Sequence, residues 1–280
     1  ESKYIKNKIF KSDELYYENG KNKYELLKNS IKKGLINCIL IDSYNIDTND
    51  IYEIKKNIPL VLFLDENSNS KANIVICSQP IKLNLSNNIK CLVGPKYAPI
   101  SKKFLFKEMK NNKRNNILIS FGAYDSIGLT LIAIEAIKQL ISKNKYDLNV
   151  IILLSKESPI IEKVKYSVDK FSKFKLILDS KKVENIYKKC SISLGSAGLS
   201  YLERMASGIS SILIAPNKLH DELIYNWVKL GCAIRAENSV ESIQYKLKLL
   251  LLDDNLREII INKGRKLIDG NGANRIANEI

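Results

Sequence analysis

The stretch "NILISFGAYDSIGLTLIAIEAIKQLISKNKYDLNVIILLS", residues 116–155, decides the fold class. Its two ends, 116–122 and 148–155, are short apolar runs, and the segment 126–143 between them has the spacing of an amphipathic helix. Apolar runs joined by a helix are typical of a parallel sheet that helices cover on both faces. The stretch therefore predicts a strand–helix–strand unit of an α/β domain.

The same alternation continues almost to the end of the chain. Further strands are expected at 173–179, 190–195, 210–216 and 232–237, and further helices at 159–170, 182–189, 199–207, 219–230, 239–252 and 255–268. This pattern predicts a doubly wound domain, whose ligand crevice lies at the carboxyl ends of the parallel strands. Residues that directly follow a strand are therefore the first candidates for a functional site.

A less regular α/β region precedes this domain. Strands are expected there at 37–42, 59–65, 73–77 and 90–94, and helices at about 13–33, 50–57 and 101–111. The polar run "NNKRNN" at 111–116 is the best candidate for a linker. We therefore expect two Rossmann-type domains in 280 residues: an incomplete N-terminal one at 1–112 and a nucleotide-binding C-terminal one at 116–280.

The chain is strongly basic, with 45 Lys and Arg against 30 Asp and Glu and a net charge of +15. Basic proteins attract anions, but the lysines are scattered among Asn and Ile rather than clustered. Two interpretations stay open: lysines that only face solvent, or attraction of a phosphorylated substrate. No patch typical of nucleic-acid binding is present, and no apolar run approaches the ~18 residues of a membrane span. We expect a cytoplasmic protein without a signal peptide, with a monomer favoured.

Cysteine and histidine usage argues against metal chemistry. No two cysteines form a C-x-x-C pair, and most lie in or beside apolar runs, which is typical of buried, reduced thiols in a cytoplasmic protein. The five cysteines are Cys38, Cys77, Cys91, Cys190 and Cys232. His220 is the single histidine, and the chain has no Asp-x-Asp motif. We therefore expect neither a metal requirement nor a cofactor.

Small and acidic residues follow two of the predicted strands in the C-terminal domain. Gly122 allows a tight turn into a helix, and the free amides at a helix start attract phosphate. Ser196 and Gly198 permit close approach of a ligand to the backbone. Glu203, one turn further on, can accept two hydrogen bonds from a ribose diol. The alternatives are a simple strand–helix turn at Gly122 and a solvated helical carboxylate at Glu203.

Other strand ends carry polar residues for which both a functional and a structural role stay open. Asn217 follows the strand 210–216, and its amide can both donate and accept hydrogen bonds. His220 is either an acid/base group or a capping or exposed residue. In the N-terminal half, Asp42 and Tyr44 follow one strand and Asp65 the next, and each could equally be a helix cap.

Five blocks of the sequence carry a resemblance to a known family. They are "LIDSYNID" (40–47), "FLDENSNSKANIVICSQP" (63–80), "GPKYAPISKKF" (94–104), "ILISFGAYD" (117–125) and "GSAGLSYLERMASGISSILIAPNKLHDELIYNWVKLG" (195–231). In this order they resemble the UDP-2,4-diacetamido-2,4,6-trideoxy-β-L-altropyranose hydrolase of pseudaminic acid biosynthesis and its spore-coat polysaccharide relatives. That family is itself similar to two-Rossmann-domain glycosyltransferases of the GT-B type.

The resemblance implies a reaction and a set of roles. Water would replace UDP at the anomeric carbon of a UDP-linked 2,4-diacetamido-2,4,6-trideoxyhexose. Tyr44 and Asn217 would be the catalytic residues that contact the sugar. The other implied roles are nucleotide binding by Gly122, Asp125, Ser196, Gly198 and Glu203, and sugar-side contacts by Asp42, Asp65 and Tyr97.

The chain departs from the family pattern in several places. The Gly-x-Gly-His-x-x-x-Arg turn, whose histidine is the expected base, is not found, and the resemblance implies about 45 to 60 missing residues at the start. Ala123 replaces a second glycine, Lys218 a glutamine, and Ile100 and Ser101 a Leu-Arg pair. Three functions therefore stay open: a UDP-sugar hydrolase, a related glycosyltransferase, or a nucleotide-sugar-binding module without catalysis.

Overall fold

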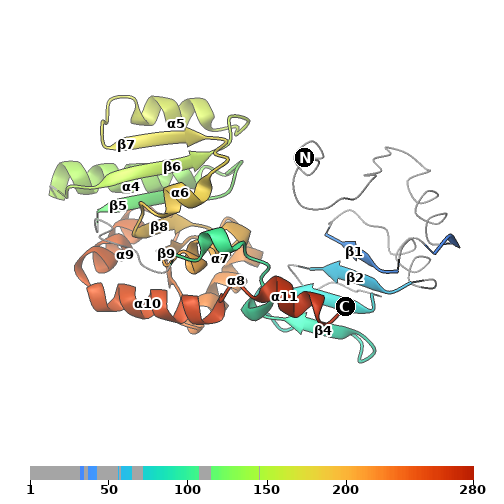
Figure 1. Cartoon of the computed structure of the whole chain (residues 1–280). Coiled ribbons are helices and arrows are strands. Elements are labelled where there is room, and N and C mark those ends of the chain that lie inside the picture. Colours follow the sequence, from blue (N-terminus) through green and yellow to red (C-terminus); the bar gives the residue numbers. More distant parts are fainter. Residues whose placement is uncertain are drawn as a thin grey trace. The chain divides into compact units, whose positions relative to one another are not determined.

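A computed structural model describes most of the chain after its first thirty residues (Figure 1). The described residues are 32–34, 37–42, 56, 58–64, 72–106, 115–144 and 146–280. The chain divides into two compact units. The first comprises Glu1–Ile76 and Leu83–Leu92, and the second comprises Cys77–Lys82 and Val93–Ile280.

The first unit is built on a four-stranded sheet in the order β1-β2-β3-β4. The strands are β1 (Ile39–Ile41), β2 (Leu60–Phe63), β3 (Ile74–Cys77) and β4 (Lys90–Val93). β2 pairs in parallel with both β1 and β3, and its residues Leu60 and Leu62 are buried in a small apolar core. The four predicted strands are confirmed, each shorter than predicted. Most of the predicted helices at 13–33 and 50–57 lies outside the described residues.

The second unit contains a six-stranded sheet in the order β10-β9-β8-β5-β6-β7. All of its strand pairs are parallel. The strands are β5 (Asn116–Ser120), β6 (Asn149–Leu154), β7 (Phe174–Leu178), β8 (Ile192–Gly195), β9 (Ser210–Leu213) and β10 (Ile234–Arg235). Every strand predicted for this domain is present, and the doubly wound architecture is confirmed.

Two apolar cores cover the two faces of this sheet. Along β5, Ile117 and Ile119 face one core and Leu118 faces the other, because successive strand residues point to opposite faces. The first core contains α4 (Leu129–Asn144), α5 (Ile161–Val168) and α9 (Val240–Leu252), and the second contains α6 (Val183–Tyr187), α7 (Leu199–Ala206) and α8 (Lys218–Lys229). β5 is thus apolar on both sides, so it stands out in the sequence as a continuous apolar run.

The segment 93–106 packs with the second unit, although the sequence places it in the first domain. It forms two short 3-10 helices, η1 (Pro95–Tyr97) and η2 (Lys102–Phe104), in place of the described part of the helix predicted at 101–111. Phe104 is buried in the second core, where its ring centroid lies 5.7 Å from that of Tyr187. The packing boundary therefore precedes the predicted linker.

Two further helices complete the second unit. α10 (Asp254–Leu267) was predicted, whereas α11 (Gly272–Ala277) was not. α11 lies against η1: Arg275 donates a hydrogen bond of 2.9 Å to the carbonyl oxygen of Lys96, and an added Cβ at Gly272 would overlap the Ala98 carbonyl. This contact explains why the segment 93–106 belongs to the second unit.

Candidate nucleotide-binding site

The order of the strands places a crevice between β5 and β8. The chain runs outward from β5 through β6 to β7, then returns to the other side of β5 to form β8. The helices that follow β5 and β8, α4 and α7, pack against opposite faces of the sheet. Such a reversal leaves a crevice at the carboxyl ends of the two strands, the usual ligand position in open α/β sheets.

A cavity of about 270 Å³ opens at the carboxyl ends of β5, β6 and β7. Its polar part is formed by residues that follow the strands and by α7, and its apolar part by β6, β7 and α6. The lining residues are Ser120, Gly122, Ala123, Leu153, Leu154, Ser155, Ile177, Asp179, Ser180, Val183, Tyr187, Ser200 and Glu203. The cavity is thus an amphipathic slot beside the crevice.

Glu203 is the acidic group that α7 contributes to the cavity. It is partly buried, and burial raises the pKa of its carboxyl group. Lys103 and Arg204 oppose this shift by their positive charges, whereas the carboxylate of Glu184 adds to it. An ionised Glu203 is therefore poorly solvated in the unliganded protein and gains from any donor that enters the cavity.

Arg204, the next residue of α7, is completely buried. Its guanidinium donates to the carbonyl oxygens of Ser120 (3.4 Å) and Ser196 (2.9 Å), which lie at the ends of β5 and β8, and to the hydroxyl of Ser200 (3.2 Å). Burial lowers the pKa of Arg204. One side chain thus links the two strand ends that border the crevice.

The three glycines around the crevice have different roles. Gly195 is buried between Ser120 and Arg204, and an added Cβ would overlap the Ser120 carbonyl and lie 2.7 Å from Arg204 Nη2. Gly122 is exposed, with φ of 93°, and lines the cavity. Gly198 is the N-cap residue of α7 and has open space around it. Gly195 is needed for packing, whereas Gly122 and Gly198 leave room for a ligand.

Asp125 has a structural role in the unliganded protein. Its buried carboxylate accepts hydrogen bonds from the amides of Leu129 (3.1 Å) and Thr130 (2.6 Å), so it caps the start of α4. Its φ of 40° is in the left-handed region, which Asp tolerates better than most residues. The family resemblance implies that Asp125 contacts a nucleotide, and that role stays a prediction. In this structure both carboxylate oxygens accept hydrogen bonds from helix amides.

Asn217 and His220 form a pair at the start of α8. The Asn217 side-chain oxygen accepts from the His220 amide at 3.0 Å and lies 3.0 Å from His220 Nδ1. Asn217 is the N-cap of the helix and is exposed. The cap of this helix is therefore Asn217, not His220, for which a capping role was considered; the predicted sugar contact of Asn217 stays a prediction.

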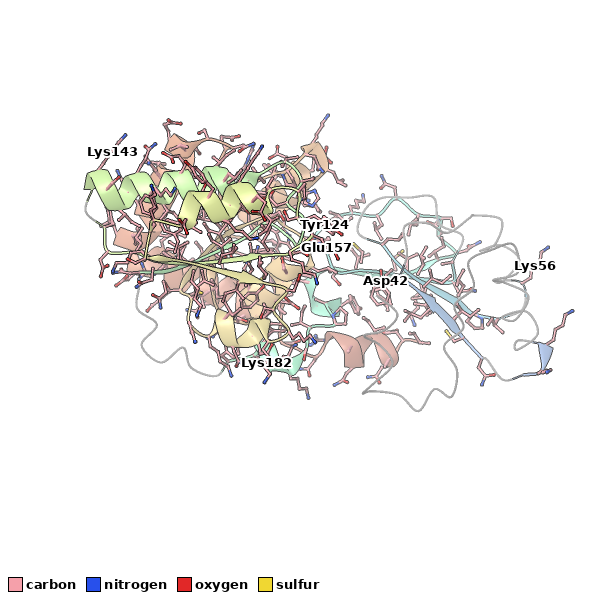
Figure 2. All side chains as sticks on the ribbon, turned by 90° about the horizontal axis from the view of Figure 1, so that it is seen from above. Asp42, Lys56, Tyr124, Lys143, Glu157 and Lys182 are labelled. Atoms are coloured by element: carbon pink, nitrogen blue, oxygen red, sulfur yellow. The ribbon has the colours of Figure 1, made fainter. Side chains whose placement is uncertain are left out.

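The predicted sugar-side residues are spread over the chain. Asp42 is exposed and directly follows β1 in the first unit (Figure 2). Tyr97 lies in η1 of the second unit, partly exposed, with the Lys96 ammonium 4.9 Å from its ring centroid. Tyr44 and Asp65 lie outside the described residues. Of the predicted site residues, Gly122 and Glu203 line one cavity, and Ser196 and Gly198 follow the adjacent strand β8.

Some lining residues were missed by the sequence analysis. Asp179 directly follows β7 and has φ of 46°, so the strand-end rule could have found it. Tyr187 comes from α6, and burial raises its pKa to about 12, so its hydroxyl stays protonated and able to donate. At the rim, the Tyr124 hydroxyl donates to a Glu157 carboxylate oxygen at 3.1 Å, which links the loops after β5 and β6 (Figure 2).

Two further properties of the described residues bear on function. No group of three or more His, Cys, Asp or Glu side chains in this part of the chain is arranged to hold a metal ion. Across the same residues, none of the helices combines the length and the apolar character needed to cross a membrane.

Comparison with known proteins gives distant relatives. No family model matches the chain. An uncharacterized protein of Methanocaldococcus jannaschii is 27% identical over 224 residues, which cover 73% of this chain but only 45% of that protein. The spore coat polysaccharide biosynthesis protein SpsG of Bacillus subtilis is 20% identical over 268 residues, covering 90% of this chain and 78% of SpsG. The chain is thus a distant homologue of SpsG and spans less than half of its archaeal relative.

Solved structures define the class of fold. The complex of MnaA from S. aureus with UDP superimposes with a TM-score of 0.66 at 14% identity, covering 91% of this chain and 78% of MnaA. Glycosyltransferases and UDP-N-acetylglucosamine 2-epimerases share this likeness. The chain therefore has the GT-B-like architecture of two Rossmann-type domains.

Proposed function

We propose that this chain binds a UDP-sugar in its second unit and hydrolyses it, releasing UDP from a UDP-linked 2,4-diacetamido-2,4,6-trideoxyhexose. The observation that carries the proposal is the amphipathic cavity beside the crevice between β5 and β8, with the Glu203 carboxylate in its wall. The similarity to SpsG, a polysaccharide biosynthesis protein, and to the UDP complex of MnaA supports the class of ligand.

The geometry suggests where each part of the nucleotide binds. The ribose diol would donate hydrogen bonds to the Glu203 carboxylate, which burial leaves poorly solvated. The diphosphate would lie in the crevice at the start of α7, where Gly198 has open space around it and the helix amides favour an anion. The uracil base would fill the apolar part of the cavity, which Ile177 and Val183 help to line.

The proposed reaction is a substitution at the anomeric carbon. The oxygen of water forms a bond to that carbon, the bond from the carbon to the β-phosphate oxygen breaks, and UDP leaves with the electron pair. The water loses one proton to a base. The amides at the start of α7 would stabilise the charge that develops on the leaving diphosphate. Asn217 and Tyr44 would orient the sugar, as the family resemblance implies.

A product assay tests this function against the alternatives. The full chain is incubated with a panel of UDP-hexoses, and UDP, free sugar and the remaining UDP-sugar are each quantified. A hydrolase releases UDP and free sugar in equal amounts without an acceptor. A changed sugar still attached to UDP would indicate an epimerase, and release of UDP only with an added acceptor would indicate a glycosyltransferase.

A binding measurement separates loss of catalysis from loss of the ligand. Calorimetry with UDP should show binding to the full chain. Binding of UDP without turnover of any UDP-sugar would favour a nucleotide-sugar-binding module. If UDP did not bind at millimolar concentration, the proposed site itself would be wrong.

A further inference from the structure

Arg204 occupies an unusual position for a charged helical residue. It is fully buried, and one of its partners lies far away in the sequence: the carbonyl of Ser120 is 84 residues upstream, at the end of β5. The carbonyl of Ser196, at the start of the loop after β8, accepts from the other terminal nitrogen. The two strands part at this point because their helices pack on opposite faces of the sheet, and Arg204 supplies donors to carbonyls on both sides of the gap.

We propose that Arg204 is the positioning residue of the diphosphate crevice, fixing the ends of β5 and β8 and supplying a buried positive charge to an anionic ligand above them. This inference rests on the proposed function, because it concerns the same crevice. Arg204 acts through the strand ends and through its charge; the groups that meet the ligand directly are the α7 amides and Glu203.

The electrostatics of the site support a role beyond packing. A buried cation is costly unless an opposite charge or several hydrogen bonds compensate it. Among the described residues, none of the ion pairs involves Arg204; carbonyls, a serine hydroxyl, the side chain of Tyr187 and the ring of Tyr201, whose centroid lies 5.7 Å away, surround it. The partly buried Glu203 carboxylate opposes the lowering of the Arg204 pKa, and a diphosphate in the crevice would add further negative charge.

Gly195 provides independent support for this geometry. Only a residue without a side chain fits there, because the space that a Cβ would need is filled by the Ser120 carbonyl and the Arg204 guanidinium. The two strand ends and the arginine are therefore packed as one unit, directly below the residues that the ligand would contact.

The test compares UDP with uridine, which lacks the diphosphate. Kd values are measured by calorimetry for UDP and by NMR titration for uridine, on the full chain and on the variants Arg204→Met and Arg204→Lys. Arg204→Met should weaken UDP binding by about 10- to 100-fold and change uridine binding by less than about 3-fold. Arg204→Lys keeps the charge and should restore part of the UDP affinity.

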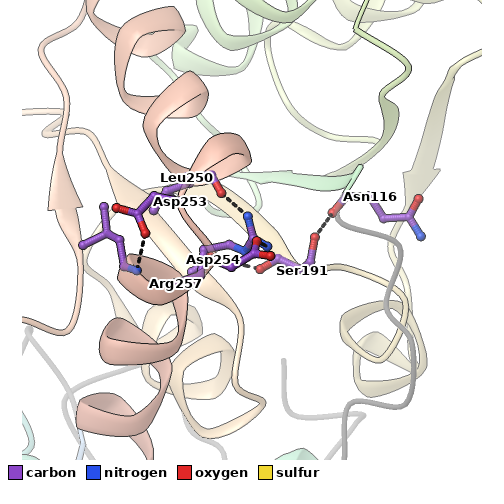
Figure 3. A network of polar contacts seen from close by, with 8 residues as sticks. Asn116, Ser191, Leu250, Asp253, Asp254 and Arg257 are labelled. Carbon is purple, nitrogen blue, oxygen red and sulfur yellow. Dashed lines mark hydrogen bonds and ion pairs between the residues drawn. The ribbon is translucent and has the colours of Figure 1, made fainter.

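A matched control is available in α10. Arg257 is also buried and also donates to a main-chain carbonyl, that of Leu250, but it is paired with Asp254 (Figure 3) and does not line the cavity. Arg257→Met should lower stability without changing the ratio of UDP to uridine affinity. A buried arginine that serves only the fold would behave in this way.

A spectroscopic measurement keeps the proposal testable if Arg204→Met does not fold. The Nε–H resonance of Arg204 in the unmodified protein should shift on addition of UDP and much less on addition of uridine. If UDP binds but both ligands weaken by the same factor in the variants, or if UDP leaves the resonance unchanged, the inference is wrong while the proposed function stands. If the unmodified chain binds neither ligand, the proposed function fails, and the inference fails with it.

Discussion

Replacing Glu203 by Gln should make the protein more stable and, at the same time, weaken its binding of UDP. Burial raises the pKa of Glu203, so the folded state disfavours its ionised form. A raised carboxyl pKa stabilises the fold fully below the unfolded value of 4.5, and this stabilisation is lost as pH rises through the folded value. A neutral glutamine avoids that loss, so the melting temperature at pH 7 should be higher in Glu203→Gln, with the difference shrinking toward pH 4.

The affinity should move in the opposite direction. A carboxylate that accepts from the ribose diol makes charge-assisted hydrogen bonds, each worth roughly 1.5–3 kcal/mol. Glutamine retains one acceptor oxygen without the charge, so a loss of about 1.4–2.8 kcal/mol, or 10- to 100-fold in Kd for UDP, is expected. In the unmodified chain, UDP binding should also weaken as pH falls through the raised pKa, and this component should be absent from Glu203→Gln.

The assay is calorimetric titration with UDP between pH 5 and pH 8, together with thermal unfolding of the unliganded proteins. Glu184→Gln is the control, because Glu184 is a neighbouring carboxylate of α6 that is paired with Lys103 at 3.5 Å and does not itself line the cavity. Its UDP affinity should stay within about two-fold of the unmodified chain. An unchanged Kd in Glu203→Gln would remove Glu203 from the nucleotide site, whatever its effect on stability.

Three other outcomes follow from the same geometry. Gly195→Ala should cost about 1–3 kcal/mol in the free energy of unfolding, because its Cβ would overlap the Ser120 carbonyl, whereas Gly198→Ala, with open space around it, should change it by less than about 1 kcal/mol; urea denaturation measures both. Asp125→Ala should lower stability by about 1 kcal/mol or more through loss of the α4 cap, and equal melting temperatures would contradict this. Treatment with a chelator should leave the Kd for UDP unchanged; loss of binding would show that a metal is needed.

The sequence predicted the second unit well because its central strands β5 and β6 are apolar on both faces. That pattern is local. Ile117 and Leu118 face different cores, and both must be apolar because each side chain is buried, so a continuous apolar run identifies the strand. The packing of the segment 93–106 with the second unit could not be read from the sequence, because its place depends on distant contacts. Phe104 packs against Tyr187, and no local periodicity reports that contact.

Two residues that the sequence singled out, Gly122 close after β5 and Glu203 in the helix that follows β8, both line the cavity. A position after a strand could not distinguish a ligand contact from a cap, because one carboxylate can serve either purpose, and Asp125 caps α4. Arg204 was missed for a different reason. A charged residue in a helix is normally solvated, and its burial here depends on the end of a strand that lies 84 residues upstream.

The crevice therefore combines a buried positive charge with a carboxylate whose ionised form is disfavoured. Burial lowers the pKa of Arg204 and raises that of Glu203, so both groups are held in an environment that opposes their charged forms. Neither shift stabilises the fold near neutral pH, because each charged group loses hydration that its protein partners replace only in part. A ribose diol and a diphosphate would compensate both groups together, one by donating hydrogen bonds and the other by bringing negative charge. If UDP binds as proposed, it would stabilise the fold, and ligand affinity would be coupled to the order of the β5 and β8 ends.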